Sequence, residues 1–180
     1  METRFITFES TRLAVHVAGR GPVAILLHGY PLDHRMWLDA LQGPLAQQRT
    51  LVALDLRGHG LSPWCGDRAH TMELFADDVA TVIHTLSDEP VDLVGLSMGG
   101  YAALAVMERH LATEAWFTGD EYGIADIALY AYTCVAPHGG IALDAYPALR
   151  GWLARVEATP GFVPLPAPDT VAQALIHQSR

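Results

Sequence analysis

Apolar residues in the first half of the chain fall into short runs, separated by longer stretches with helical spacing. The runs at residues 23–27, 51–54 and 91–95 are mainly apolar, which is typical of strands buried on both faces of a parallel sheet. Between the last two runs, apolar residues recur at helical spacing from Met72 to Leu86, and Thr71 is suited to start that helix. Strands that alternate with helices in this way predict an α/β fold with a parallel sheet.

Two further patterns complete the first half. Residues 4–10 and 12–18 have the pattern of two short strands joined by a tight turn around residues 9–11. A helix is expected after the strand at 23–27. Its apolar stripe consists of Trp37, Leu38, Leu41 and Leu45.

The second half contains no further run with the pattern of a strand. Four helices are expected there, at residues 101–116, 124–136, 146–157 and 170–179. The second of these is apolar on nearly all sides, which is typical of a buried helix. We therefore divide the chain into a sheet-forming part, residues 1–108, and an all-helical segment, residues 109–180.

Composition narrows the possible functions. The chain has 180 residues, a net charge of −9, 51% hydrophobic residues and 17% charged residues, as in an ordinary globular protein. The acidic balance and the lack of basic runs argue against nucleic acid as a partner, and no apolar run is long enough to span a membrane. Cys65 and Cys134 form no C-x-x-C pair, and the N-terminus has no signal-peptide pattern, so a cytoplasmic location is expected. No metal or cofactor motif is present, and none is expected to bind.

The strand at 91–95 leads into the sequence Gly95-Leu96-Ser97-Met98-Gly99, a G-x-S-x-G motif between a strand and a helix. In this context a sharp turn exposes the serine hydroxyl, and glycines on either side avoid a clash with the strained backbone. Ser97 is therefore a candidate nucleophile, and the amide of Met98 would point toward an oxyanion formed there. The alternative is a glycine-rich turn with an incidental serine.

Three motifs carry a resemblance to a known family. They are HGYPLDHRMW from residue 28, DLRGHGLS from residue 55 and GLSMGGY from residue 95. Their order and spacing over residues 1–108 resemble the first half of the esterases and lactonases of the α/β-hydrolase fold. The resemblance implies a small-molecule ester or lactone as substrate.

The same resemblance implies roles for individual residues. Ser97 would be the nucleophile, and the backbone N–H groups of Tyr30 and Met98 would form the oxyanion hole. The residues that would shape the surrounding loops are His28, Gly29, Gly95 and Gly99. Asp55 would be scaffold rather than chemistry, and packing within loops is the favoured role of both His28 and His59.

The helical segment resembles something else. WFTGDEYGIADIALYAYTCVAPHGG and YPALRGWLARVEATPGFVP are similar to the last part of the helical C-terminal domain of bacterial glutathione transferases, over residues 103–165. By this resemblance Asp126 is a structural helix cap, and no transferase active-site residue is present. The fold class expected is thus α/β: a truncated α/β-hydrolase parallel sheet followed by an all-helical segment, as in a chimera.

The acid and the histidine of a catalytic triad should follow Ser97 on turns after later strands. The candidates present are His110, His138, His177, Asp120, Asp144 and Asp169. None follows a strand, so surface positions are expected for all of them. The strand at 91–95 would also lack its outer neighbour, which predicts self-association through an open sheet edge.

Three functions therefore stay open. The first is a serine hydrolase for a small ester or lactone, impaired because the triad acid and histidine are not found. The second is a non-catalytic chimeric or truncated protein whose helical tail serves as a packing or interaction module. The third is a glutathione transferase-like protein that lacks its glutathione-binding domain.

Overall fold

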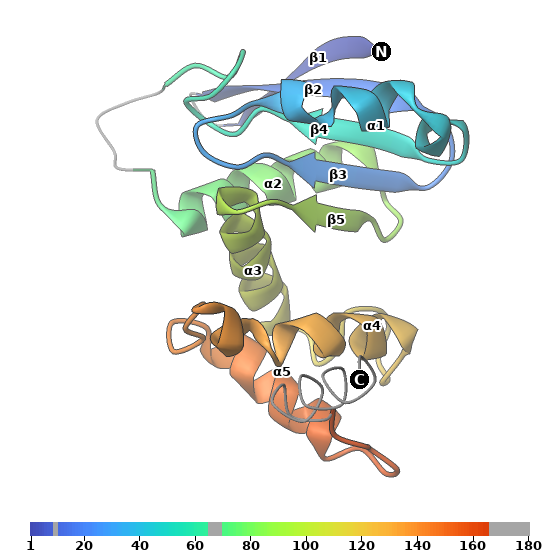
Figure 1. Ribbon diagram of the computed structural model, residues 1–180, viewed down its shortest axis with the longest axis vertical. Coiled ribbons are helices and arrows are strands. Elements are labelled where there is room, and N and C mark those ends of the chain that lie inside the picture. The colour runs from blue at the N-terminus through green and yellow to red at the C-terminus, as the bar shows by residue number, and fades with distance from the viewer. Residues whose placement is uncertain (9–10, 65–69, 166–180) are drawn as a thin grey trace, which may run out of the picture. The chain divides into compact units, whose positions relative to one another are not determined.

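A computed structural model describes residues 1–8, 11–64 and 70–165 (Figure 1). The chain forms two compact units, Met1–His110 and a second unit that begins at Leu111. The turn at residues 9–10, Cys65, Asp169, His177 and the helix expected at 170–179 lie outside the described residues.

The first unit is built on a five-stranded sheet with the order β1-β2-β4-β3-β5. The strands are β1 (Glu2–Phe8), β2 (Thr11–Gly19), β3 (Val23–Leu27), β4 (Thr50–Leu54) and β5 (Asp92–Gly95). β3 pairs in parallel with both β4 and β5, whereas β2 pairs antiparallel with β1 and β4. The sheet is therefore mixed, with a parallel part formed by the three strands that the apolar runs predicted, and the α/β class is confirmed.

The register of the parallel strands brings their carboxyl ends to one edge of the sheet. Leu27 of β3 lies opposite both Leu54 of β4 and Gly95 of β5. Loops that follow parallel strands meet at this edge, where α/β proteins place their sites. Among the described residues, β5 has β3 as its single strand partner, so its outer side is open.

Helices pack on both faces of this sheet. One face is covered by α2 (Met72–Leu86) and α3 (Met98–Leu111), with Phe75, Val79 and Val82 buried against Ile25 and Leu54. The other face is covered by α1 (Leu38–Gln42), whose Leu41 packs on Leu26 and Ala53. Thr71 caps α2 as predicted, since its hydroxyl accepts a hydrogen bond from the amide of Leu74.

Two helix predictions in this unit need correction. In place of one helix around residues 37–45, the chain forms η1 (His34–Trp37), α1 and η2 (Pro44–Gln47). Gly43 adopts an extended backbone and Pro44 begins a new turn, so the helix cannot continue through them. The helix expected to reach residue 116 ends at Leu111.

The second unit contains α4 (Ile124–Thr133), η3 (Ala136–Gly139) and α5 (Pro147–Glu157), and no strand among its described residues. Asp126 is buried and joins α4 to α5. Its carboxylate accepts hydrogen bonds from the amide of Gly123 at 3.0 Å and from the indole N–H of Trp152 at 2.8 Å. Asp126 therefore caps α4 and also holds the neighbouring helix.

The burial predicted for residues 124–136 is wrong. Ile124 and Tyr132 of α4 are 79% and 84% exposed, and Asp126 and Thr133 are the buried residues of this helix. The apolar character of α4 is thus not matched by burial within its own unit. A small unit with few helices can cover only one side of each of them.

Candidate functional site

Ser97 lies in the turn between β5 and α3 at the carboxyl edge of the sheet. Its φ of 51° is the only positive value among the described non-glycine residues. The amide of Leu96 still donates to the carbonyl of Leu27, which extends the β3–β5 ladder, and the amide of Gly100 donates to the carbonyl of Ser97. The chain therefore reverses within two residues and leaves the serine exposed.

Glycines make this turn sterically possible. A Cβ on Gly95 would lie 2.3 Å from the carbonyl oxygen of Gly99, and a Cβ on Gly99 would lie 2.4 Å from that of Leu27. Real Cβ atoms do not approach backbone oxygens so closely, so any larger residue at either position would displace the strand or the helix. A Cβ on Gly29 would lie 3.3 Å from the Cβ of Ser97, which places the Gly29 backbone directly beside the serine.

The two amides expected to bind an oxyanion are both available. Among the described residues, the N–H groups of Tyr30 and Met98 donate no hydrogen bond to a protein acceptor. Met98 is the first residue of α3, where amides have no partner within the helix and the helix dipole favours negative charge. Tyr30 follows Gly29, so its amide lies on the same loop that borders Ser97.

His28 begins this loop and has a structural role. It is fully buried, its Nε2 accepts a hydrogen bond of 3.0 Å from the amide of Leu56, and its Nδ1–H donates to the carbonyl of Gly29. Burial lowers the pKa of the ring, which favours the neutral form that this bonding requires. His59 lies 5.0 Å from His28 between ring centroids and 6.0 Å from Tyr30, and its Nδ1 hydrogen-bonds the carbonyl of Arg57.

Asp55, the first residue after β4, contacts the same loop at His34. Its carboxylate is fully buried and accepts hydrogen bonds from the backbone amides of His34 and Leu61, at 2.7 and 2.8 Å. The imidazoles of His16 and His34 also face it, at 3.1 and 2.9 Å. Burial alone would raise the pKa of Asp55, but these hydrogen bonds outweigh it and bring the pKa below its ordinary value.

His16, His34 and Asp55 also invite comparison with a metal site, because one ligand atom from each lies within 4.8 Å of the others. However, the two imidazole rings are stacked, with centroids 3.3 Å apart and planes at 15°. The lone pairs of a stacked pair run parallel instead of converging on one ion, and the nitrogens already face the carboxylate. The cluster therefore fits a hydrogen-bonded network better than a metal centre.

No base is placed beside the serine in the described part of the chain. Ser97 makes no side-chain hydrogen bond to a histidine there. His110 lies at the far end of α3, about 20 Å along the helix from Ser97 at 1.5 Å per residue. His138, Asp120 and Asp144 are exposed residues of the second unit.

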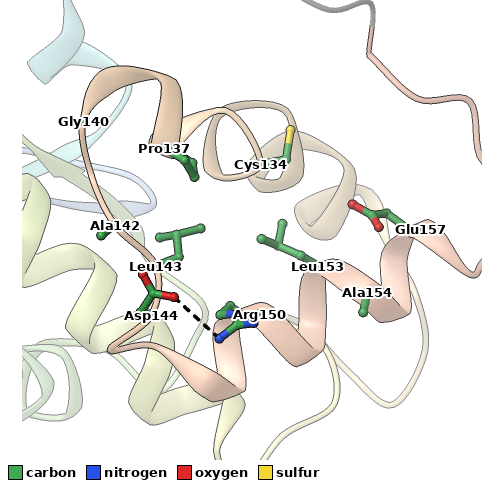
Figure 2. Close-up of a pocket in the computed structure, with 10 residues that line it drawn as sticks. All are labelled: Cys134, Pro137, Gly140, Ala142, Leu143, Asp144, Arg150, Leu153, Ala154 and Glu157. Atoms are coloured by element: carbon green, nitrogen blue, oxygen red, sulfur yellow. Dashed lines mark ion pairs between the residues drawn. The ribbon is translucent and has the colours of Figure 1, made fainter.

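The second unit has a pocket of about 600 Å³ between η3 and α5 (Figure 2). Leu143 and Leu153 point into it from opposite sides, and Asp144 and Arg150 face each other at its rim, 4.0 Å apart. Both charged side chains are largely exposed, so solvent weakens their attraction. None of the described residues that line this pocket is a serine or a histidine, so it holds no Ser–His pair.

Sequence reasoning missed the contribution of His16 and His34. A signal was present for His16, which is the one polar residue in the apolar run LAVHVA of β2. A buried polar side chain needs a hydrogen-bonding partner, and here the partner is Asp55. His34 gave no comparable signal, because its environment depends on a residue far along the chain.

Comparison with known proteins supports the fold. The profile of the Alpha/beta hydrolase family matches residues 24–179. The AB hydrolase superfamily protein YisY of Bacillus subtilis (strain 168) is 42% identical over 106 residues, which cover 58% of this chain and 38% of that protein. The 2-hydroxymuconate semialdehyde hydrolase of Pseudomonas sp. (strain CF600) is 31% identical over 109 residues, or 59% of this chain and 38% of that protein. The chain thus spans 38% of the length of these relatives.

Solved structures agree. A thermophilic esterase from Thermogutta terrifontis has a TM-score of 0.55 and 33% identity, over 64% of this chain and 44% of that one. ALR0039 from Nostoc sp PCC 7120, described as a putative alpha/beta hydrolase, has a TM-score of 0.56 and 24% identity, over 86% of this chain and 60% of that one. This second likeness concerns the fold alone.

These comparisons correct the interpretation of the helical segment. The family profile extends across it, and nothing supports the resemblance of residues 103–165 to a glutathione transferase domain or the idea of a chimera. Amphipathic helices with a proline in the first turn and a carboxylate cap occur in many folds, so these features identify no family. Because its family profile covers most of the sequence and the same fold recurs in solved relatives, this chain belongs to the alpha/beta hydrolase family.

Proposed function

We propose that this chain is a serine hydrolase in which Ser97 Oγ attacks the carbonyl carbon of a small ester or lactone. The observation that carries the proposal is the strained turn at Ser97, with the two unengaged amides of Tyr30 and Met98 beside it. The relatives that support this class are the semialdehyde hydrolase and the thermophilic esterase.

The reaction has two stages. In the first, an Oγ–carbon bond forms, the carbonyl oxygen takes up negative charge, and the bond to the alcohol oxygen breaks as that oxygen gains the serine proton. In the second, water attacks the acyl-serine and releases the acid. N–H donors placed where the oxyanion develops can lower the barrier by several kcal/mol, about 3–4 for a single donor.

The proton of Ser97 has no acceptor among the described residues, so we propose that hydrolysis is slow. In a serine protease stripped of its triad, binding and the oxyanion hole still leave roughly 10³–10⁴-fold acceleration over water. We expect this chain to operate in that range, well below a typical kcat of about 10 s⁻¹.

Labelling with a fluorophosphonate probe, together with hydrolysis of p-nitrophenyl acetate, tests the proposal. We expect slow labelling that Ser97→Ala abolishes, because the amides of Tyr30 and Met98 would assist attack by Ser97 Oγ even without a base. Ser87→Ala is a matched control, since Ser87 is a partly exposed serine after α2 whose hydroxyl hydrogen-bonds the backbone of Glu89. Labelling that survives Ser97→Ala would refute the site, and a kcat near 10 s⁻¹ would refute the missing base.

A second candidate function is a non-catalytic packing or interaction module in the helical unit. The observation in its favour is the exposed apolar face of α4, with Ile124, Ile127 and Tyr132 between 50% and 84% exposed. Such a patch on a small protein marks a surface that another surface covers. A chain that no fluorophosphonate labels, and whose assembly changes with Tyr132→Ser, would favour this function over hydrolysis.

A further inference from the structure

We propose that the end of β4 clamps the loop that carries the Tyr30 amide, with Asp55 and His34 as positioning residues for the oxyanion hole. This inference rests on the proposed function of Ser97. Neither residue touches the reacting atoms. Their role is to hold residues 28–34 in the geometry that points the Tyr30 amide toward the substrate oxygen.

The loop is held at both of its ends by two consecutive residues. At its start, the ring of His28 accepts a hydrogen bond from the amide of Leu56. At its end, His34 donates to Asp55 twice, from its backbone amide at 2.7 Å and from its ring Nδ1 at 2.9 Å. Asp55 and Leu56 directly follow β4, the central strand of the sheet. Both ends of the loop are therefore hydrogen-bonded to the end of that strand.

Asp55 is itself fixed from the opposite side. Its second carboxylate oxygen accepts from the amide of Leu61 at 2.8 Å and from the ring of His16 at 3.1 Å, and His16 is held in turn by Thr3 at 3.0 Å. A Cβ on Gly60 would lie 2.2 Å from that oxygen, so the backbone there packs directly against the carboxylate. These contacts fix the orientation of the Asp55 carboxylate, so the position of His34 is fixed relative to the sheet.

The segment between the two anchor points is tightly folded. The amide of Leu32 donates to the carbonyl of Gly29 at 2.8 Å, which closes a turn around Tyr30. Asp33 then caps η1 by accepting from the amide of Arg35 at 2.9 Å. A donor aimed in advance contributes more to catalysis than one that must be ordered during the reaction, so loss of the clamp should weaken the Tyr30 donor.

Two measurements on a small set of variants test the clamp. His34→Leu removes the ring donor, and His34→Asn restores an N–H close to the position of Nδ1. Val79→Ala lowers stability without removing a hydrogen bond of the clamp, because Val79 is buried in the apolar core between α2 and the sheet. The readouts are the second-order rate of Ser97 phosphonylation and the hydrogen exchange of the Leu32 amide.

We expect His34→Leu to slow phosphonylation by roughly tenfold or more and to speed exchange at Leu32. His34→Asn should recover most of both effects. Val79→Ala should change neither the phosphonylation rate nor the exchange at Leu32, even if it lowers the melting temperature as much as His34→Leu does. Phosphonylation and Leu32 exchange that stay at wild-type values in His34→Leu would overturn the clamp, as would equal effects in Val79→Ala.

Failure of the proposed function is recognised separately. If wild-type Ser97 is not labelled, the hydrolase proposal fails, and the clamp is then judged on hydrogen exchange alone. Faster exchange at Leu32 in His34→Leu but not in Val79→Ala would still support it, and identical exchange in both would reject it.

Discussion

Ser97 adopts a backbone conformation that costs a non-glycine residue about 1–2 kcal/mol. The neighbours that fix it there are Leu96, bonded to β3, and the first turn of α3, bonded to the Ser97 carbonyl. Strain of this kind persists only where surrounding structure over-determines it, and it is concentrated at functional sites. The serine is thus exposed and held by strand and helix at once.

Asp33 is a single residue that makes a pH-dependent contribution to the free energy of unfolding. Hydrogen bonds from the Arg35 side chain are the main reason that the pKa of Asp33 falls to about 2, from an ordinary value of 3.8. Since the pKa is lower in the folded chain, the stabilisation is complete above about pH 4 and disappears as the pH falls toward 2. Arg35 is largely exposed, so we expect only about 1 kcal/mol.

Urea denaturation of wild type and Asp33→Asn at a series of pH values measures this contribution. The difference in unfolding free energy should be constant between pH 5 and 7 and shrink below pH 4. Asp39→Asn serves as a control, because Asp39 lies in the first turn of α1 and forms no ion pair with any residue that the structure describes. A difference that grows with acidification would contradict the assignment.

Local patterns predicted part of the site and distant contacts decided the rest. Ser97, Gly95 and Gly99 were predictable because the strain and its relief lie within five consecutive residues. The network around Asp55 was not, since its partners lie 39 residues away at His16 and 21 residues away at His34. No local pattern encodes such pairings, and the residue type alone leaves packing and chemistry equally open.

A buried ion pair joins the end of β4 to α2 in the first unit. Arg57, just after β4, donates two hydrogen bonds to Asp78 of α2, at 2.9 and 2.6 Å, and both side chains are buried. Removal of either member deprives a buried charge of this ion-pair partner, which is strongly destabilising. This pair therefore fixes how α2 seats against the end of the sheet.

The adjacent residue in α2 offers a matched comparison. Asp77 forms an ion pair with Arg109 of α3, but both side chains are partly exposed to solvent. We expect Asp78→Ala to lower the unfolding free energy by about 3–5 kcal/mol, and Asp77→Ala by less than about 1 kcal/mol. Chemical denaturation of the two variants measures both values, and comparable losses would show that burial is not what distinguishes them.

At the element scale, periodicity served best where one pattern ran without interruption. α2 and the strands β3 and β4 were predictable because their burial follows their own repeat. β5 forms where its apolar run predicted a strand, but it is mostly exposed instead of buried on both faces. The segment from His34 to Gln47 splits into three short helices because Gly43 and Pro44 interrupt the apolar stripe. For α4, the apolar composition indicated burial. The burial of a helix also depends on how many other elements pack around it, and the sequence of the helix itself does not encode that number.

Association is a property of the whole molecule, and the outer side of β5 is where we expect it. Val94 and Leu96 are 43% and 50% exposed, and no described strand pairs with this side. An uncovered strand edge offers N–H and C=O groups to a second chain. We therefore expect oligomers or aggregates whose size increases with protein concentration in size-exclusion chromatography. The described helices include none long and apolar enough to cross a bilayer.

A charged residue on β5 distinguishes association through the strand edge from non-specific hydrophobic association. Val94→Lys should shift the protein toward the monomer, because lysine on an edge strand opposes pairing. Val163→Lys, at an 81% exposed position of the second unit, should have little effect. A monodisperse wild-type monomer that binds no dye for apolar surface would show that the edge is not available.

The strand order also has a consequence for the sequence of folding events. β4 lies at the centre of the sheet. Among the described strands, β5 pairs with β3 alone, by four residue pairs between distant parts of the chain. Contacts between distant segments form late in folding, because the entropy cost of closing the loop comes before the favourable contacts are made. Segments held by few contacts are also the first to unfold locally. We therefore expect the turn at Ser97 to be among the last features of the first unit to assemble and among the first to be lost, while the loop held by Asp55 can already be in place.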